Sequence, residues 1–529
     1  MRRRAFVAGT AAALAAPSLA RGDQASVLKY APGGDLPSVD PLLIPSYETR
    51  SHAFMVFDTL YGQAGAESGF AARPQMVAAH QIEDDGRTWK LTLREGLLFH
   101  DGTRVLARDC VASIRRWSVR DQSGQTLMQR VDALVAPDDR TILFRLRTPF
   151  PMLPDALGKF GTQMCAMMPE RLASTDPFKP ITEVIGSGPF RFKADEQVSG
   201  SLHVYERFAD YQPREDGKAD FIAGPKVAHF DRVEWHIIPD PTTAIGALKN
   251  GEIDWVEYPL EDVLPALRRD RRVKLEVLGA AGWWGVMRPN HTLPPFNNPA
   301  IRRALLHALD QRDFMTAAIG TDPAQWHVPM GYFSPASPMA SDAGLAVLSG
   351  GRDLGKARSE LRAAGYRGEK IVVILPATLW RARVFGEVAA ELLRRIGMNV
   401  EEQVMDTASW ARRLVSRNTP DQGGWNVFCT SMQGTDALSP ASHAALRGNG
   451  AAALAGWPDS PTLETLRERW LEAPDSAAQR AIADDIQAQA FIDVPYYPLG
   501  AFYPSTAYRS DLTGVLDGQA IFWNVRRDV

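Results

Sequence analysis

Cysteine is scarce in this chain. Only three cysteines occur among 529 residues, Cys110, Cys165 and Cys429, and they lie far apart. An odd number cannot pair completely within one chain, and none stands at a spacing from another cysteine or from a histidine that would suit a metal. We therefore interpret all three as small buried hydrophobic side chains and predict no metal site. One disulfide stays open as an alternative if the protein works in an oxidising compartment.

An excess of charge of one sign is also missing. Lys and Arg number 59 against 62 Asp and Glu, which leaves a formal net charge of -3, and no run of like charge marks an acidic or basic tail. A balanced charge gives no general attraction to nucleic acid or to an anionic membrane surface. The sequence thus predicts no nucleic-acid partner.

The common catalytic and cofactor motifs are absent as well. In residues 65–69 the serine comes one place too late for G-x-S-x-G, and no H-E-x-x-H, calcium loop or phosphate loop occurs. Residues 448–453 loosely imitate a dinucleotide fingerprint, but no convincing strand precedes them, so a flexible loop is the favoured interpretation. The ten histidines are dispersed and form no i, i+4 pair. The sequence predicts a non-enzymatic protein without a cofactor, while an enzyme of a new kind acting on peptides or glycans stays open.

The N-terminus carries the most specific local feature. Arg2, Arg3 and Arg4 precede a stretch of apolar and small residues at 5–16, and Ser18-Leu19-Ala20 follows as a cleavage pattern. The apolar stretch is shorter than the ~20 residues that a membrane anchor needs. We predict a signal peptide at 1–20 and a periplasmic mature chain. The segment 3–7 resembles a twin-arginine signal, and no cysteine near the cleavage site can carry a lipid.

The remaining chain has the pattern of a mixed α/β protein. Alternating apolar residues predict strands at 89–93, 142–146 and 230–238, with a helix over 108–116. Residues 371–375, 384–396 and 398–404 read as strand, helix and strand, which is typical of a βαβ unit with parallel strands. Asn298 and Pro299 begin another helix as its N-cap and first residue, and a helix is expected over 353–364. We expect two α/β regions that meet at a cleft, where ligand sites tend to lie.

An ordered series of short motifs points to one family. They are FDTLY at 57–61, DGRTWKLTLR at 85–94, EGLLFHDGT at 95–103, GSGPF at 186–190, NGEID at 250–254 and DVPYYPL at 493–499. With further matches at 295–305 and 356–366, this series resembles the family 5 extracellular solute-binding proteins, the oligopeptide, dipeptide and nickel-binding group, over about residues 28–520. Cys110 and Ser187 depart from residues common in the family, at positions where no ligand contact is expected. Taken alone, motifs such as GSGPF are tight turns that set the fold and do not touch a ligand.

The resemblance implies a two-lobed periplasmic binding protein of type II, class C-like, with an extra domain on lobe one. Lobe one would comprise 23–56, 185–262 and 496–529, the extra domain 57–184, and lobe two 263–495. The chain would cross between the lobes near 260–262 and near Tyr497 and Pro498, and these short segments would act as hinges.

The function that the resemblance implies is the substrate-binding component of an ABC importer. The protein would capture a peptide or peptide-like solute between its lobes, act as a monomer, and deliver the solute to a permease in the inner membrane. A non-peptide solute (an amine, opine, sugar or nickel complex), a chaperone-like protein and a hydrolase are the alternatives.

Two segments supply the candidate ligand-binding residues. Trp283 and Trp284 begin a predicted strand, so one is expected in the core and the other at the cleft. Arg288 shares a face with Trp284, a pairing suited to a ligand carboxylate, and Asn290 follows on the same segment. The alternative is one core tryptophan and a solvated arginine.

The second segment, 425–436, reads as a buried strand that runs into a Gly-containing loop, with Met432 and Gln433 near its end. In the resembling peptide binders, an Asp four residues before a Pro holds the α-amine of the ligand. Asp436 and Pro440 match that spacing. The extra acidic residue common in peptide binders is missing from the flanks, and a turn in which Asp436 only bonds nearby backbone amides stays open.

Overall fold

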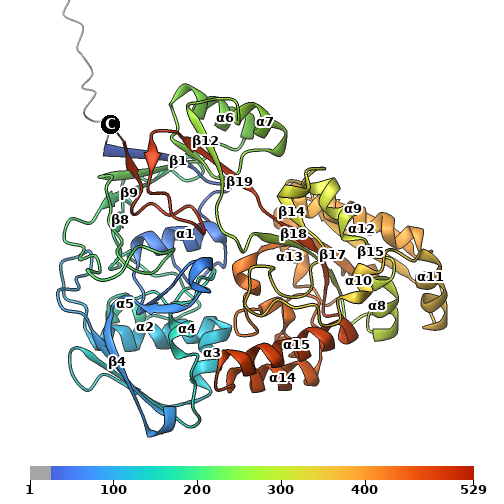
Figure 1. The fold of residues 1–529 in the computed structure, drawn as a ribbon, viewed down its shortest axis with the longest axis horizontal. Helices are drawn as coiled ribbons and strands as arrows, with labels where there is room; N and C mark the ends of the chain where they lie inside the picture. The colour runs from blue at the N-terminus through green and yellow to red at the C-terminus, as the bar shows by residue number, and fades with distance from the viewer. Residues whose placement is uncertain (1–25, 529) are drawn as a thin grey trace, which may run out of the picture.

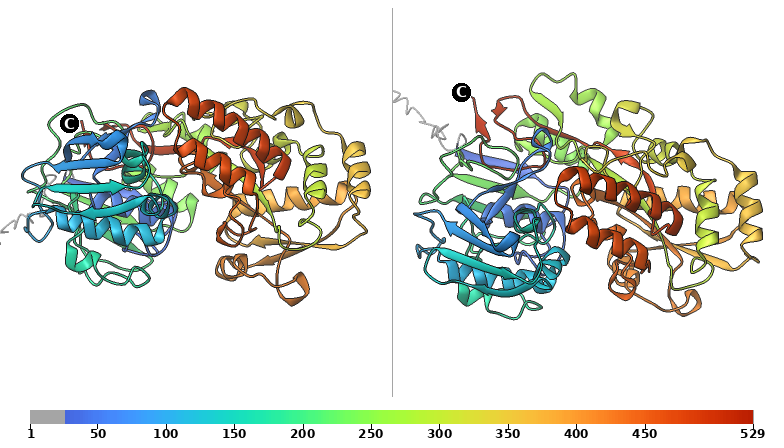
Figure 2. Two further views of the ribbon diagram at one scale, coloured as in Figure 1. Left: turned by 90° about the horizontal axis from the view of Figure 1, so that it is seen from below. Right: turned by 60° about the horizontal axis from the view of Figure 1, so that its bottom comes forward.

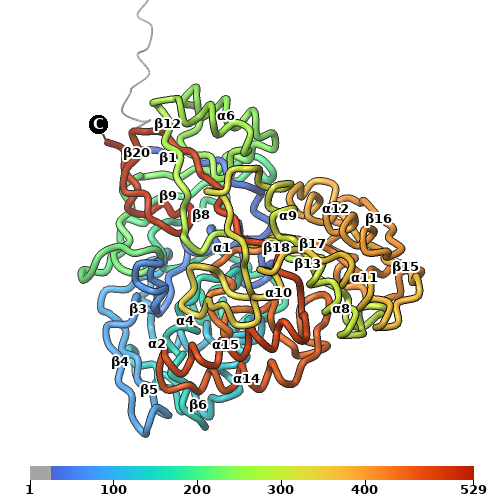
Figure 3. Tube along the Cα trace, turned by 45° about the vertical axis from the view of Figure 1, so that its right-hand side comes forward, coloured from blue at the N-terminus to red at the C-terminus, as the bar shows by residue number. Residues whose placement is uncertain are grey.

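The structure, a computed structural model, describes residues 26–528, so the predicted signal peptide at 1–20 lies outside the described residues. Two large β-sheets organise two lobes, and a smaller four-stranded sheet forms the extra domain (Figure 1). Strand β4 of the extra domain and strands β15 and β16 of lobe two lie at opposite ends of the molecule (Figure 3). Within 26–528, no helix has the length and apolar character needed to cross a bilayer.

The sheet of lobe one has seven strands in the order β12-β19-β11-β1-β10-β9-β8. Its strands are β1 (Val27–Ala31), β8 (Phe190–Phe192), β9 (Leu202–Arg207), β10 (Arg232–His236), β11 (Trp255–Val256), β12 (Val273–Val277) and β19 (Ser505–Arg509). Central strand β1 pairs in parallel with β10 and β11, and β10 is the strand predicted at 230–238. Helices α1 (Tyr47–Val56), α6 (Pro241–Asn250) and α7 (Leu264–Leu267) complete this lobe.

The sheet of lobe two has six strands in the order β14-β18-β13-β17-β15-β16. They are β13 (Trp283–Pro289), β14 (Trp326–His327), β15 (Lys370–Pro376), β16 (Asn399–Met405), β17 (Val427–Gln433) and β18 (Tyr497–Phe502). Its helices are α8 (Pro299–Leu306), α9 (Gln311–Ala318), α10 (Ala346–Ser349), α11 (Leu354–Ala363), α12 (Trp380–Arg395), α13 (Thr407–Leu414), α14 (Pro461–Leu471) and α15 (Ser476–Asp493).

Two local predictions for this lobe agree with the structure. Strands β15 and β16 pair in parallel and α12 connects them, as the predicted βαβ unit requires. Asn298 caps α8, because its side-chain oxygen accepts a hydrogen bond from the backbone amide of Ala300 at 2.9 Å.

The extra domain is built on the antiparallel sheet β4-β5-β7-β6. Its elements are β2 (Tyr61–Gln63), β3 (Ala72–Pro74), β4 (Val77–Glu83), β5 (Thr88–Leu93), α2 (Ala107–Arg120), α3 (Gln122–Met128), β6 (Val131–Val135), β7 (Thr141–Leu146), α4 (Leu153–Gly158) and α5 (Glu170–Ala173). Strands β5 and β7 are the two that alternation predicted, and they pair with each other. All three cysteines of the chain are buried and unpaired in the structure.

Strand pairing corrects both predicted crossings between the lobes. Strand β12 pairs with β19 in lobe one, so the first crossing lies at residues 278–282, after the predicted position at 260–262. Strand β18 pairs with β13 in lobe two, so the second lies at 503 and 504, after the predicted Tyr497 and Pro498. Residues 261–263 form a short 3₁₀ helix within lobe one instead. Both crossings come later in the sequence than predicted because β12 extends the sheet of lobe one beyond residue 262 and β18 extends that of lobe two beyond residue 498.

The GSGPF motif has a structural role that the structure makes explicit. A Cβ atom added to Gly186 would lie 2.0 Å from the carbonyl oxygen of Val56, and one on Gly188 would lie 2.5 Å from that of Met55. Only glycine permits this close approach of two backbones at the end of α1. The motif therefore sets the packing of the strand β8 region against α1.

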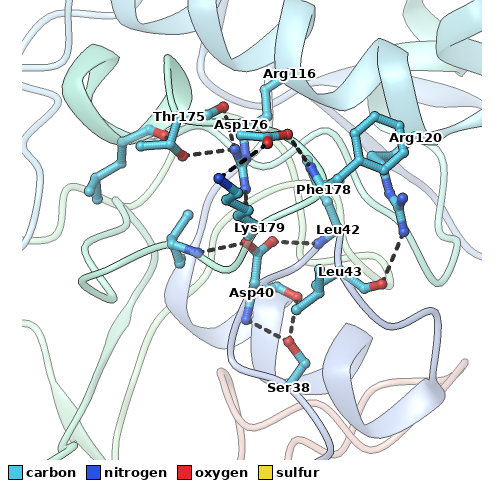
Figure 4. Close-up of polar contacts among 12 residues, drawn as sticks. Ser38, Asp40, Leu42, Leu43, Arg116, Arg120, Thr175, Asp176, Phe178 and Lys179 are labelled. Atoms are coloured by element: carbon cyan, nitrogen blue, oxygen red, sulfur yellow. Dashed lines mark hydrogen bonds and ion pairs between the residues drawn. The ribbon is translucent and has the colours of Figure 1, made fainter.

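A buried ion pair fastens the extra domain to lobe one (Figure 4). Arg116 on α2 donates to a carboxylate oxygen of Asp40 at 2.9 Å, and both side chains are only 1% exposed. The same guanidinium donates to the carbonyl oxygens of Thr175 and Lys179, and Asp40 also accepts from the backbone amide of Ile181. The charges are thus paired and hydrogen-bonded, as burial requires.

Candidate functional site

The end of β17 in lobe two meets the first turn of α1 in lobe one. Tyr47 donates its hydroxyl hydrogen to a carboxylate oxygen of Asp436 at 3.1 Å and accepts from the backbone amide of Gln433 at 3.0 Å. Asp436 lies in the 3₁₀ turn Gly434–Ala437 that follows the strand. The segment predicted to reach the ligand therefore lies at the interface between the lobes.

Arg50 supplies a buried cation beside this contact. Its guanidinium donates to the side-chain oxygen of Gln433 at 2.6 Å and to that of Gln519 at 3.2 Å, and it lies 3.9 Å above the ring of Phe160. Burial lowers the pKa of Arg50, against the effect of Asp436. Burial likewise raises the pKa of Asp436, and the charge of Arg50 opposes that rise. Asp436 thus has a cation nearby, but Arg50 and Asp436 form no ion pair within residues 26–528.

The adjacent tryptophans point to opposite sides of β13. Trp283 makes edge-to-face contacts with Tyr47 at 5.0 Å and Tyr258 at 5.9 Å between ring centroids, so it contacts lobe one. Trp284 is fully buried against His443 inside lobe two. Met432 lies opposite Trp284 in the ladder and packs on the same core.

Arg288 and Asn290 lie inside lobe two, which corrects the expectation that they face the cleft. Arg288 donates to the carbonyl oxygens of Ala455 at 2.7 Å and Ala445 at 3.2 Å, and burial lowers its pKa to about 10. Asn290 donates to the carbonyl oxygen of Trp425 at 3.1 Å. Arg288 does share the face of Trp284, as the alternation predicts. The segment that includes 445–455 covers that face, and sequence alternation alone does not show which face is covered.

A cavity of about 240 Å³ lies between the extra domain and lobe two. Most of its wall is apolar, and the side chains include Phe70, Phe150, Met152, Phe160, Met339 and Trp470. Its charged lining residues are Asp155, Lys159 and Arg467. Thr435 also lines the cavity, and Lys159 acts electrostatically on Asp436, so the cavity adjoins the contact between α1 and β17.

Further contacts hold the two sides of the cavity together. Helices α14 and α15 lie side by side between the two halves of the molecule (Figure 2). Arg130 of the extra domain forms an ion pair with Glu468 of α14, and Gln479 of α15 donates to the sulfur of Met152 at 3.2 Å. Near the crossings, Arg381 of α12 pairs with Glu261 of lobe one. The structure thus shows the lobes in contact around the cavity.

Several residues of this region escaped prediction from the sequence. Tyr47, Arg50, Asp155, Lys159 and Arg467 belong to segments that lie up to several hundred residues from β17. The one local signal is a charged residue within an otherwise apolar helical face, as for Arg467 between Leu463, Trp470 and Leu471. Only the tertiary arrangement shows that these charges share one cavity.

Comparison with known proteins identifies sequences that resemble this chain over most or all of its length. The sequence profile described as "Bacterial extracellular solute-binding proteins, family 5 Middle" matches residues 71–452. A "Probable peptide ABC transporter periplasmic-binding protein y4tO" of Sinorhizobium fredii is 36% identical over 99% of this chain and 99% of its own length.

Two solved structures share the fold. One is the periplasmic binding protein AgaA of A. tumefaciens R10 in complex with agropinic acid, with a TM-score of 0.79 at 18% identity, covering 95% of this chain and 99% of that one. The other is DppA of Helicobacter pylori in complex with the peptide STSA, with a TM-score of 0.78 at 21% identity, covering 95% and 98%. The fold is therefore that of two-lobed periplasmic binding proteins.

Proposed function

The chain belongs to family 5 of the bacterial extracellular solute-binding proteins, and we propose from this membership that it captures a peptide or peptide-like solute between its lobes for delivery to an ABC permease. The relative named as a probable peptide-binding component aligns over nearly the full length of both chains, which supports the same role here. The role is that of a carrier, so no chemical step and no cofactor is needed.

One observation supports this function from the geometry. The cavity between the extra domain and lobe two combines apolar walls with both negative and positive side chains, Asp155, Lys159 and Arg467. A peptide offers the complementary set, a protonated amine, a carboxylate and apolar side chains. A solute that touches both walls interacts with both lobes only when they are together, so binding shifts the population toward the closed form.

Asp436 is the proposed partner of the ligand's α-amine. It stands at the end of β17 at the interface of the lobes, with one carboxylate oxygen hydrogen-bonded to Tyr47. A carboxylate in such a water-poor place gains from a cation, and an ammonium supplies both charge and hydrogen-bond donors. Arg50 already provides part of that positive charge. Replacing Asp436 by asparagine therefore measures how much affinity the ligand's ammonium group gains from the carboxylate.

Arg467 replaces Arg288 as the proposed partner of the ligand's carboxylate. It lines the cavity, is 5% exposed, and donates through Nε to the carbonyl oxygen of Pro440 at 3.0 Å. One of its terminal nitrogens has no hydrogen-bond acceptor among residues 26–528, although Glu468 lies 3.6 Å away. This leaves a guanidinium N–H free for an anionic group of the solute.

A second candidate solute is an opine-like compound. The structurally similar AgaA is described in complex with agropinic acid, and a cavity of about 240 Å³ lies just below the ~300–1,000 Å³ typical of ligand sites. Such a volume favours a small solute over a long peptide in either case.

The proposed location is the periplasm, with export by the twin-arginine route, no lipid anchor and a monomeric state. Arg3 and Arg4 followed by apolar residues, and the lack of a cysteine near residue 20, support export without lipidation.

Two measurements on the protein purified from the periplasm test the function. Native mass spectrometry should show a co-purified solute of peptide mass, and a thermal-shift screen of di- and tripeptides should identify binders. A ligand at 100 times its dissociation constant adds about 2.7 kcal/mol to the free energy of unfolding. Stabilisation by opines alone would favour the second candidate, and no shift with any peptide or opine would overturn the proposed function.

A further inference from the structure

Asp155 is an acidic residue in the wall of the cavity that has no cationic partner. It lies in the short helix α4 of the extra domain, half-buried. No ion pair or side-chain hydrogen bond to its carboxyl group is formed within residues 26–528. Burial raises the pKa of Asp155 to about 6, and backbone amides, those of Asp155 itself and Ala72, are all that oppose the rise. A carboxylate that is largely removed from water destabilises the fold unless a positively charged group lies beside it.

The nearest candidate on the same helix is already engaged. Lys159 follows Asp155 by four residues, the spacing at which opposite charges on a helix pair. Its ammonium group instead forms an ion pair with Asp121, the residue that caps α3 by accepting from the backbone amides of Ser123 and Gly124. Lys159 is thus held toward α3, and Asp155 remains without a cation.

The cation on the opposite wall, Arg467, also forms no ion pair with Asp155 within the described residues. Arg467 of α14 donates to the carbonyl oxygen of Pro440 and lies 3.6 Å from Glu468. Of the three charged side chains that line the cavity, Lys159 pairs with Asp121, and Arg467 lies beside Glu468 without a hydrogen bond to it. Asp155 alone among them has no oppositely charged partner in the described part of the chain.

The surroundings of Asp155 suit an aliphatic stem. The cavity wall around it is formed by aromatic and thioether side chains such as Phe70, Phe150, Met152 and Trp470. Long basic side chains bury their methylene groups against such surfaces while the charged end reaches a polar partner. The cavity therefore offers the two features that a lysine-like group needs, an apolar wall and an acid.

We propose that Asp155 binds a cationic group at the end of an aliphatic chain of the solute, so that the cavity selects peptides with a basic side chain. The inference rests on the proposed function, because it names the class of solute that the same site would take. Asp155 would act beside Asp436, the first binding the side-chain cation and the second the α-amine.

Calorimetric titration with matched dipeptides tests the proposal. Lys-Ala and Ala-Lys are compared with their norleucine counterparts, which keep the four-carbon stem and lack the ammonium group, at pH 7.5. For at least one position of the lysine, the unmodified protein should bind the lysine dipeptide about 10- to 100-fold more tightly than the norleucine dipeptide. The variant Asp155→Asn should lose this preference while it still binds the norleucine dipeptide. Asp132→Asn, at an exposed position of β6 in the same domain, should keep the preference.

Each outcome decides a separate point. Equal affinity for lysine and norleucine dipeptides in the unmodified protein would overturn the role of Asp155 and leave peptide capture standing. A lysine preference that survives Asp155→Asn, in a variant that melts cooperatively, would also overturn it. If none of the four dipeptides binds, and the wider peptide screen is also negative, the proposed function itself fails.

Discussion

At the scale of single residues, the carboxyl group of Asp436 already has one hydrogen-bond donor and one nearby positive charge from the protein. Tyr47 donates to it and Arg50 lies near it, yet burial still raises its pKa. A residue in this position can stabilise the fold or bind the ligand. Asparagine, which has the same shape without the charge, separates the two roles, because it lowers stability in the first case and affinity in the second.

We predict that Asp436→Asn lowers the affinity for the peptide ligand about 10- to 100-fold, a change of ~1.4–2.8 kcal/mol, with little loss of thermal stability. The amide keeps the shape and the contact with Tyr47 but removes the charge that holds the amine. Isothermal titration calorimetry and thermal unfolding measure the two effects. A variant that binds as tightly as the parent, or one that unfolds, would show that Asp436 has a structural role only.

Asp155 gives a prediction for stability against pH. Its folded-state pKa of about 6 lies above the ordinary 3.8, so the folded protein holds this proton more tightly than the unfolded chain does. The ionised group therefore costs stability, and the cost is absent below about pH 4, grows between pH 4 and 6, and is complete above pH 6. Neither of the other charged groups that line the cavity offsets this cost, because Lys159 pairs with Asp121 and Arg467, on the opposite wall, lies 3.6 Å from Glu468.

We expect Asp155→Asn, without solute, to be more stable than the parent at pH 7.5 by no more than about 3 kcal/mol, and the gain to vanish near pH 4. Thermal unfolding at pH 4, 5, 6 and 7.5 measures the difference between the two proteins. Asp132→Asn serves as the control, with a difference that stays near zero. A gain for Asp155→Asn that does not change with pH would contradict the prediction.

At the scale of elements, the sequence predicted well where the pattern is local. The helix cap at Asn298 and the unit β15-α12-β16 rest on residues within about 35 positions of one another. The crossings were misplaced because they depend on the pairing of β12 with β19, strands more than 220 residues apart. The same limit applies to the site. Alternation predicted that Trp283 and Trp284 face opposite ways, but tertiary packing decides which face the lobes share.

The buried pair Arg116–Asp40 joins elements that the sequence keeps apart, and a double-mutant cycle measures its strength. Arg116→Met and Asp40→Asn should each cost about 3–5 kcal/mol, because each leaves one buried charge without its partner. The double variant should cost clearly less than the sum, since no buried charge remains. Urea unfolding measures all three.

The control for this cycle is the exposed pair Lys90–Glu83, whose side chains are 40% and 46% exposed. Lys90→Met should change the free energy of unfolding by less than about 1 kcal/mol. Additive costs for Arg116→Met and Asp40→Asn would mean that the two charges do not stabilise each other.

At the scale of the whole molecule, contacts between lobes come from parts of the chain far apart in sequence. The ion pair Arg381–Glu261 joins lobe two to lobe one, and Arg130–Glu468 joins the extra domain to lobe two. The proposed binding site is therefore complete only when the entire chain has folded, and the export route decides in which compartment that happens.

We predict that replacing Arg3 and Arg4 together by lysine leaves the precursor in the cytoplasm, because the twin-arginine route reads that pair. Fractionation with detection of precursor and mature forms measures the effect. Arg2→Lys, which leaves the pair intact, should be exported normally. Unimpaired export of the double variant would assign the protein to the general secretory route.

The position of β19 has a consequence for the order of synthesis. This strand, at Ser505–Arg509, sits between β12 and β11, so the sheet that begins with β1 at Val27 has a gap until the last segment of the chain arrives. A ribosome must release almost the whole polypeptide before lobe one can close its ladder. Nascent chains will therefore expose the edges of β11 and β12 from about the midpoint of translation until β19 is made, and these are the edges that a chaperone would have to protect.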